Sequence, residues 1–258
     1  MRARIRLLVV PFTFLLGSSA ALAQAADKTT DLKPFDKLQV EGCFDARLVP
    51  GTPARAVVSA TADQQERIRV EQDGKRVRIG FTERDDYNVC RGGPVRVAIT
   101  ANFEKTDSVE LGMAGSGSLD ANVPRVAALK AAVAGSGRIA LKGAAGDCNL
   151  DVAGSGAVDA TAIACDSSAR VGVQGSGSTK IAGKTKTCNL VVNGSGGVAA
   201  DGLECDSADV AINGSGSAAL AKIASLNVQI NGSGNVKYRG EPTLRGVAVN
   251  GSGKLIKE

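Results

Sequence analysis

The sequence contains no histidine and no tryptophan, and only two tyrosines and six phenylalanines occur among its 258 residues. Histidine is the commonest general base and a frequent ligand of transition metals, so its absence excludes the usual hydrolase triads and most transition-metal sites. The scarcity of aromatic rings leaves few platforms on which a sugar could stack. The composition predicts a protein that is not an enzyme and has neither a cofactor nor a metal.

Long apolar runs are also missing, except at the N-terminus. Residues 1–23 have a basic start, an apolar run from Leu7 to Leu16 and a small-residue ending, which together predict a cleavable secretory signal. Cleavage is expected after Ala23 or Ala25. Because no apolar stretch of spanning length follows, we expect no transmembrane segment in the mature chain.

Charge gives little indication of a partner. The signal carries Arg2, Arg4 and Arg6, and its removal lowers the formal net charge from +5 to +2. The basic balance of the full chain therefore belongs mostly to targeting, and nucleic acid is not predicted as a partner. We expect the mature protein in the periplasm, or secreted and at the cell surface.

One short word, Gly-Ser-Gly, recurs from residue 115 to residue 253 at intervals of 18 to 21 residues. Such a fixed period is typical of repeat architectures. The first glycines of the eight copies are Gly115, Gly135, Gly154, Gly175, Gly194, Gly214, Gly232 and Gly251.

Apolar residues keep the same period. The position two before each first glycine is apolar in all eight copies, from Met113 to Val249, and so is the position four before it, from Leu111 to Val247. A third apolar position follows four residues after the first glycine, where Thr179 is the one exception. Each unit thus carries strands with one face turned inward.

A unit of about 19 residues cannot bury its own apolar face, but stacked units can. We therefore predict an all-β fold, a parallel β-solenoid of about eight coils over residues 113–258. A barrel or a sandwich would not explain identical turn residues at a fixed period, and a Gly-Ser linker would not keep apolar residues in register.

Residues 31–112 show alternating apolar runs without a repeat, and we predict that they form a non-repeating β cap, with 31–258 as one continuous domain. A hairpin is indicated at Asp73-Gly74 and a helical turn over 62–67. The expected strands lie at 38–40, 44–48, 56–60, 68–70, 77–81 and 95–100.

The repeated word is interpreted as a turn. Two glycines at a fixed corner indicate positive φ or a close backbone approach, and the serines between them can bond along the rod or to the turn. A serine nucleophile is disfavoured by eight equivalent copies without a histidine, and a calcium-binding repeat is disfavoured by the lack of regular acids. The residues before the last four copies predict an amide ladder, formed by Asn193, Asn213, Asn231 and Asn250.

Six cysteines in an exported chain predict disulfides rather than zinc, since no two of them are closer than 17 residues. On the coil frame, Cys148 lies one coil from Cys165, and Cys188 lies one coil from Cys205. Both separations are within disulfide reach, and Cys43 and Cys90 remain to pair with each other. Free buried thiols stay open as the alternative for the two repeat pairs.

The segment Leu38-x-Val40-x-Gly42-x-Phe44-x-x-x-Leu48-x-x-Gly51, followed by serial Asn-Gly-Ser-Gly words, resembles the bacterial head GIN domain family of autotransporter-adhesin-like proteins. The resemblance covers residues 35–257. It implies an exported, right-handed β-helix without an established enzymatic activity. No binding residue is carried over, because the shared motif is structural.

Three functions are compatible with these features. The first is a non-catalytic binding or adhesion-like module of the bacterial cell envelope, with an envelope protein or a glycan as its unknown partner. The second, by fold analogy, is a polysaccharide lyase or hydrolase using the acidic cluster Glu83, Asp85 and Asp86 beside Arg84 and Arg91, although a solvated loop explains this cluster more simply. The third is a structural envelope protein, in which Lys254 and Lys257 would discourage pairing at the C-terminal end.

Overall fold

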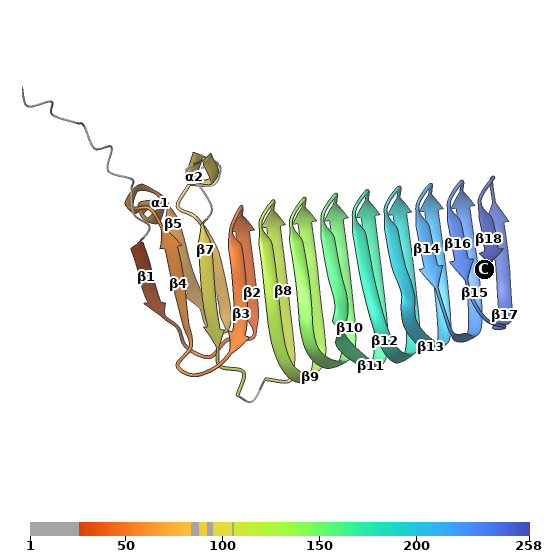
Figure 1. Ribbon diagram of the computed structural model, residues 1–258, viewed down its shortest axis with the longest axis horizontal. Coiled ribbons are helices and arrows are strands. Elements are labelled where there is room, and N and C mark those ends of the chain that lie inside the picture. Colours follow the sequence, from red (N-terminus) through yellow and green to blue (C-terminus); the bar gives the residue numbers. More distant parts are fainter. Residues whose placement is uncertain (1–25, 84–87, 92–94, 105) are drawn as a thin grey trace, which may run out of the picture.

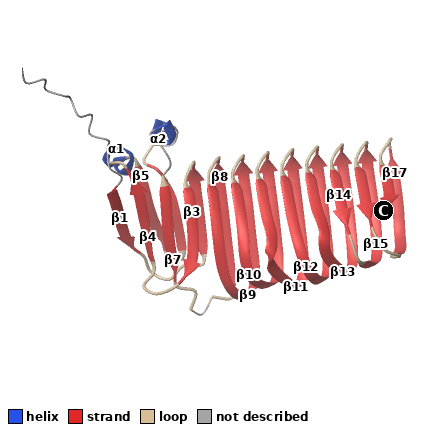
Figure 2. Ribbon diagram, in the orientation of Figure 1, coloured by secondary structure: helices blue, strands red, loops and turns tan. Residues whose placement is uncertain are grey.

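The computed structural model describes residues 26–83, 88–91, 95–104 and 106–258, so the expected signal at 1–23 lies outside the described residues. The chain is nearly all β, with 75% strand and 4% helix, and forms a β-solenoid of about eight turns. The coils follow one another along a rod, and both short helices lie at its N-terminal end (Figures 1 and 2).

In its described residues, the N-terminal region contains seven strands and two helices before the repeats begin. In chain order they are β1 (Ala26–Asp31), β2 (Lys37–Gly42), β3 (Asp45–Pro50), β4 (Arg55–Ala60), α1 (Ala62–Glu66), β5 (Ile68–Asp73), β6 (Arg76–Phe81), α2 (Asn88–Arg91) and β7 (Arg96–Ala101). The predicted runs, the helical turn and the hairpin at Asp73-Gly74 all appear among them.

The repeat region consists of strands alone in the described residues. They are β8 (Ser108–Gly115), β9 (Ser118–Gly135), β10 (Arg138–Gly154), β11 (Ala157–Gly175), β12 (Ser178–Gly194), β13 (Gly197–Gly214), β14 (Ser217–Leu220), β15 (Ile223–Gly232), β16 (Asn235–Tyr238), β17 (Thr243–Asn250) and β18 (Lys254–Lys257).

Successive coils pair in parallel with like positions in register. The first glycine of each word pairs with that of the next coil, as Gly135 does with Gly154 and Gly154 with Gly175. The segments before the corners and the segments after them form two facing layers of one 18-stranded sheet, which we call the two sheets, and these layers enclose the core. The predicted parallel stack of about eight coils is therefore confirmed.

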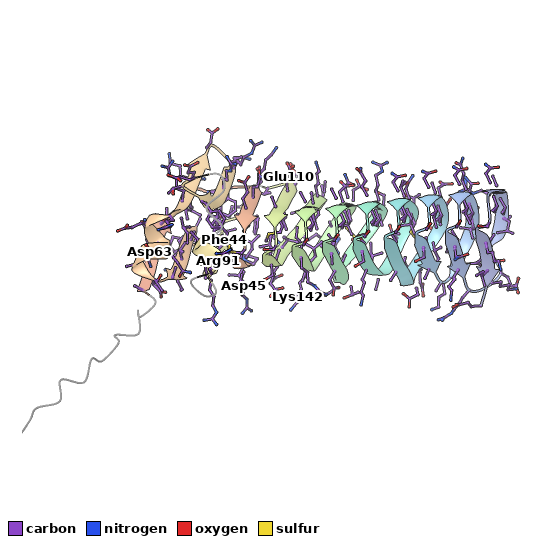
Figure 3. The ribbon with its side chains drawn as sticks, turned by 90° about the horizontal axis from the view of Figure 1, so that it is seen from above. Phe44, Asp45, Asp63, Arg91, Glu110 and Lys142 are labelled. Carbon is purple, nitrogen blue, oxygen red and sulfur yellow. A yellow bond between two sulfur atoms is a disulfide. The ribbon has the colours of Figure 1, made fainter. Side chains whose placement is uncertain are left out.

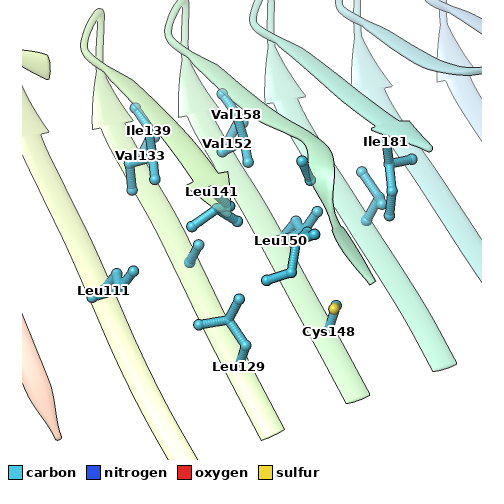
Figure 4. Close-up of a cluster of buried hydrophobic side chains, with 14 of the residues drawn as sticks. Leu111, Leu129, Val133, Ile139, Leu141, Cys148, Leu150, Val152, Val158 and Ile181 are labelled. Carbon is cyan, nitrogen blue, oxygen red and sulfur yellow. The ribbon is translucent and has the colours of Figure 1, made fainter. Parts of the chain in front are cut away.

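The core fills the space between the two sheets. Leu111, Leu129 and Leu150 have at most 1% exposed surface, and Figure 4 shows these and neighbouring side chains clustered between the strands. Thr179 is also fully buried in the third inward row, and its Oγ1 has no hydrogen-bond partner. Thr179, the one exception among the apolar positions of the sequence, therefore places a polar hydroxyl inside an apolar core.

Three disulfides crosslink the described part of the rod. Cys148–Cys165 and Cys188–Cys205 span Cα separations of 5.7 and 6.2 Å and join neighbouring coils inside the core, while Cys43–Cys90 spans 6.0 Å near the N-terminal end. These are the pairs expected from the coil spacing. All six sulfurs are bonded, so the alternative of free thiols does not hold.

Part of the N-terminal region continues the stack rather than merely covering it. Strand β2 pairs in parallel with β8, and β3 with β9, so the segment from β2 to β3 forms a further coil; β6 and β7 pair in parallel with β2 and β3 and form another. Three antiparallel strands then cover this end, because β4 pairs with β7, β1 with β4 and β5 with β6.

Among the described residues, no helix has the length and apolar character needed to cross a bilayer.

Candidate binding surface along the corners

Each Gly-Ser-Gly word forms a tight turn, which we call a corner, and the backbone of the next coil donates hydrogen bonds to it. The first glycines have φ between 106° and 131°, a region that disfavours side chains. At one corner, the backbone N–H groups of Ser155 and Gly156 both donate to the carbonyl oxygen of Gly135 in the preceding coil, at 2.9 Å. A Cβ on Gly154 would lie 2.6 Å from that same oxygen, and one on Gly156 would lie 2.5 Å from the Gly137 carbonyl.

The corner therefore explains both glycines by backbone geometry. The serine hydroxyls contribute little to a continuous ladder, because within the described residues a single hydroxyl bond joins two corners, from Ser252 to Ser233 at 2.9 Å. We assign the repeated word to the construction of the rod.

A further corner precedes the eight repeated ones, and the sequence reasoning missed it. Gly42 has φ +131°, pairs in register with Gly115, and accepts hydrogen bonds from the N–H groups of Ser116 and Gly117 at 3.0 Å. Only the first glycine of the word remains in this Gly-Cys-Phe segment. A signal was present, because Leu38 and Val40 occupy the apolar positions four and two before Gly42.

Phe44 takes the third position of this first corner. Its ring is fully buried and lies 5.1 Å from the ring of Phe81, centroid to centroid. The coil on its N-terminal side has no Gly-Ser-Gly corner, since β6 and β7 are joined through residues 82–95. Cys43 bonds to Cys90 in α2, so the aromatic pair and the disulfide together fill this end.

The outward residues just before the corners form one continuous row, which we call the corner row. Its members pair in register from coil to coil. They are Glu41, Ala114, Ala134, Ala153, Gln174, Asn193, Asn213, Asn231 and Asn250.

The four asparagines of the corner row form an amide ladder. The Nδ2 of Asn213 donates to Oδ1 of Asn193 at 2.8 Å, Asn231 donates to Asn213 at 2.9 Å, and Asn250 donates to Asn231 at 3.0 Å. A primary amide has two N–H groups and two carbonyl lone pairs. Each inner asparagine uses one of each within the ladder and has one N–H and one lone pair left for a ligand.

The N-terminal end of the corner row opens into a hollow of about 650 Å³, which we call the corner hollow. The β5–β6 hairpin forms one side of it, and Phe81 and Ala114 contribute to its lining. Arg78 donates to Oε2 of Glu41 at 2.7 Å, and Arg69 lies 3.5 Å from Glu71.

Two ion pairs, Arg78–Glu41 and Arg69–Glu71, thus join four of the charged side chains that line the corner hollow. The hydrogen bond to Glu41, followed by the negative charge of that carboxylate, raises the pKa of the Arg78 guanidinium above its usual value. Arg78 stays charged and holds Glu41 at the start of the corner row.

Farther from the corner, the same sheet carries charges of alternating sign. Glu110 lies between two lysines, with its carboxylate oxygens 3.3 Å from Lys37 and 3.6 Å from Lys130. In the view from above, Glu110 projects from one face of the rod, and Asp45 and Lys142 project from the opposite face (Figure 3). These ion pairs join β2, β8 and β9 on the corner-row face of the rod.

The described residues include only part of the acidic cluster that the sequence offered as a lyase or hydrolase site. Asp85, Asp86 and Arg84 lie outside the described residues, Glu83 lines the corner hollow, and Arg91 is exposed in α2. Within the described part of the chain, no three potential metal ligands among Cys, Asp and Glu gather at one point.

Comparison with known structures shows the same fold elsewhere. A structure from Parabacteroides distasonis, named a putative lipid binding protein, is similar with a TM-score of 0.79 and 20% identity, over 92% of this chain and 98% of that chain. A putative adhesin from Parabacteroides merdae has a TM-score of 0.77 and 17% identity, over 92% and 97%. One from Bacteroides fragilis has 0.62 and 14%, over 91% and 97%. At these identities the likeness concerns the fold alone.

No curated protein matches the sequence. A family model described as "Putative auto-transporter adhesin, head GIN domain" matches residues 34–181 and 167–242, which together cover most of the chain. The resemblance that the sequence suggested is confirmed, and this protein belongs to that head GIN domain family.

Proposed function

We propose that this protein is an exported, non-catalytic, adhesion-like module that binds an extended envelope glycan along the corner row. The family description and the names of two similar structures as adhesins support the adhesion-like role. Periplasm and cell surface are both compatible locations, and the disulfides support export.

The single observation that carries the glycan proposal is the amide ladder. Its free N–H groups and lone pairs repeat once per coil, roughly every 4.8 Å, which is close to the length of one sugar unit in an extended chain. Hydroxyl and acetamido groups of a glycan can donate to and accept from such amides. The three alanines, which Gln174 separates from the ladder, leave a low track toward the corner hollow for the rest of the polymer.

The scarcity of aromatic residues fits this mode of binding, because hydrogen bonds along a row replace ring stacking. A solenoid commonly binds through an extended face, where many modest contacts add up. The paired charges around Glu110 and in the corner hollow favour a neutral polymer over a strongly charged one.

The test uses the secreted chain and purified envelope polysaccharides, including peptidoglycan strands, in a solution binding assay. Replacing both Asn213 and Asn231 by leucine should weaken binding at least about tenfold, since two ladder amides and their free groups are lost. The matched control is Gln229→Leu, which removes an exposed amide on β15 outside the corner row and should leave binding nearly unchanged.

Equal loss in the ladder variant and in the control would contradict the proposed site. Failure of every glycan to bind, together with capture of the chain by a purified envelope protein, would favour a protein partner instead. Release of unsaturated sugars from uronic-acid polymers, abolished by Asp85→Ala, would favour the lyase alternative.

A further inference from the structure

The two ends of the rod are finished differently. At the N-terminal end, the antiparallel pairs β4–β7, β1–β4 and β5–β6 cover the edge of the stack. At the other end, β17 pairs with β15 and β18 pairs with β16, and no described strand pairs with the outer edges of β17 and β18. The last described coil thus presents two open strand edges (Figure 1).

The open end also exposes the core. Val247 and Val249 occupy the inward positions that Val228 and Ile230 fill one coil earlier, where they are at most 1% exposed. In the last coil, Val247 is 48% and Val249 is 39% exposed, and Leu244 beside them is 46% exposed. Exposed apolar side chains next to unpaired strand edges mark a surface that pairs with another chain.

The charges on the outward residues of β18 are complementary to those of a second copy of the same strand. Lys254 and Ile256 lie on the outward face of β18, and Glu258 follows on the same face, where Lys237 and Arg239 hold it at 2.7 and 3.2 Å. In an antiparallel second copy these residues follow in the reverse order, Glu-Ile-Lys, so each charge would face a charge of opposite sign. An antiparallel copy centred on Ile256 would place Lys254 across from Glu258 at both ends of the strand.

We propose that two copies of this chain join end to end at this surface through a two-fold axis, with β18 antiparallel to β18 and β17 antiparallel to β17 of the second copy. Ala248 and Ile256 are each four residues from Ser252 in the middle of the last corner, so the same axis would pass near Ala248. Val247 of one copy then lies across from Val249 of the other, and the exposed core residues cover one another. Cross-strand pairs of this kind are in direct side-chain contact.

The edge lysines do not prevent this arrangement, contrary to the role expected for them from the sequence. Lys257 forms an ion pair with Glu241 of its own chain, and Lys254 meets a carboxylate rather than another lysine. Arg245 on β17 is held by Asp209 at 2.8 Å. A parallel, head-to-tail stack would instead have to pair β17 and β18 with the covered N-terminal end.

The first test measures the mass of the secreted chain by sedimentation over a range of concentrations. We expect a monomer–dimer equilibrium, and small-angle scattering should show that the longest dimension nearly doubles in the dimer. Val247→Lys places a charge in the shared core and should weaken dimerisation at least about tenfold. The matched control, Ser217→Lys, adds the same charge to an exposed position on β14, two coils in from the last strand, and should have no effect.

The second test fixes the register by oxidation of single added cysteines. Ile256→Cys should give a covalent dimer, because residues on the two-fold axis lie about 5 Å apart, within disulfide reach. Lys237→Cys, one coil farther in, should not, since the two copies of this residue would be roughly 14 Å apart.

A monomer at all concentrations would overturn the proposal. Dimerisation that survives Val247→Lys, in a variant whose unfolding curve matches that of the parent chain, would show a lateral interface instead. Crosslinking by Ile256→Cys together with Ala248→Cys, when neither single variant crosslinks, would show that β17 pairs with β18 and refute the register. None of these outcomes depends on the glycan proposal.

Discussion

At the first corner, Gly42 is followed by a cysteine and a phenylalanine, whereas at the eight later corners the first glycine is followed by serine and glycine. Both kinds of corner keep positive φ at the first position and the same backbone hydrogen bonds to the next coil. The third position differs because of what lies on its N-terminal side. A later corner meets the backbone of a preceding corner there, and Phe44 meets Phe81 instead.

The comparison teaches that two glycines of one word are required for separate reasons. The first is required by its own backbone conformation and therefore persists at Gly42. The third is required by its neighbour and is replaced where that neighbour is absent. A residue that departs from the repeat can thus find a new contact, as Phe44 does with Phe81, or leave a polar atom without a partner, as Thr179 does.

The strongest test of this distinction makes the first corner resemble the others. Phe44→Gly restores the third glycine of the word but removes a fully buried ring from its contact with Phe81. We expect a loss of about 3–5 kcal/mol in the free energy of unfolding, measured by denaturant titration with the disulfides intact. Unchanged stability would mean that the corner, and not the aromatic pair, holds this end together.

The next test concerns a first glycine within the repeats. Gly154→Ala introduces a side chain at φ +113°, with its Cβ 2.6 Å from the Gly135 carbonyl oxygen, and should lower the free energy of unfolding by about 3 kcal/mol. The control is Gly112→Ala, where the new Cβ would lie 3.7 Å from its nearest neighbour. It should change stability by less than about 1 kcal/mol. Equal losses would refute the geometric account of the corner.

The smallest expected effect is a gain. Thr179→Val replaces a buried hydroxyl without a partner by a methyl group of similar size, and should raise the free energy of unfolding by about 1 kcal/mol. Thr161→Val is the control: its hydroxyl is exposed and donates to Asp159 at 2.7 Å, so this variant should not gain stability. The same urea titration serves for both variants, and a loss at Thr179 would show that its hydroxyl has a role in the core.

The period of the sequence was sufficient to predict the coils, their inward rows and the amide ladder, because each depends on residues one coil apart. The cysteine partners followed from the same frame. The corner hollow could not be predicted in this way, since it depends on the packing of the β5–β6 hairpin, and Arg78 and Glu41 are 37 residues apart. The corner at Gly42 could not be predicted from the full word, because this segment keeps only the first glycine; its remaining signal is the apolar pair Leu38 and Val40 before it.

The two repeat disulfides have a mechanical consequence for a rod anchored at one end and pulled at the other. The hydrogen bonds between coils run along the rod, so a force applied at the C-terminus would peel off coils one at a time. Cys188–Cys205 closes a segment with a sequence separation of 17 residues and Cys148–Cys165 closes another, so the chain within each segment cannot extend under load. Peeling would therefore release residues 206–258 first and meet its first covalent stop at Cys205.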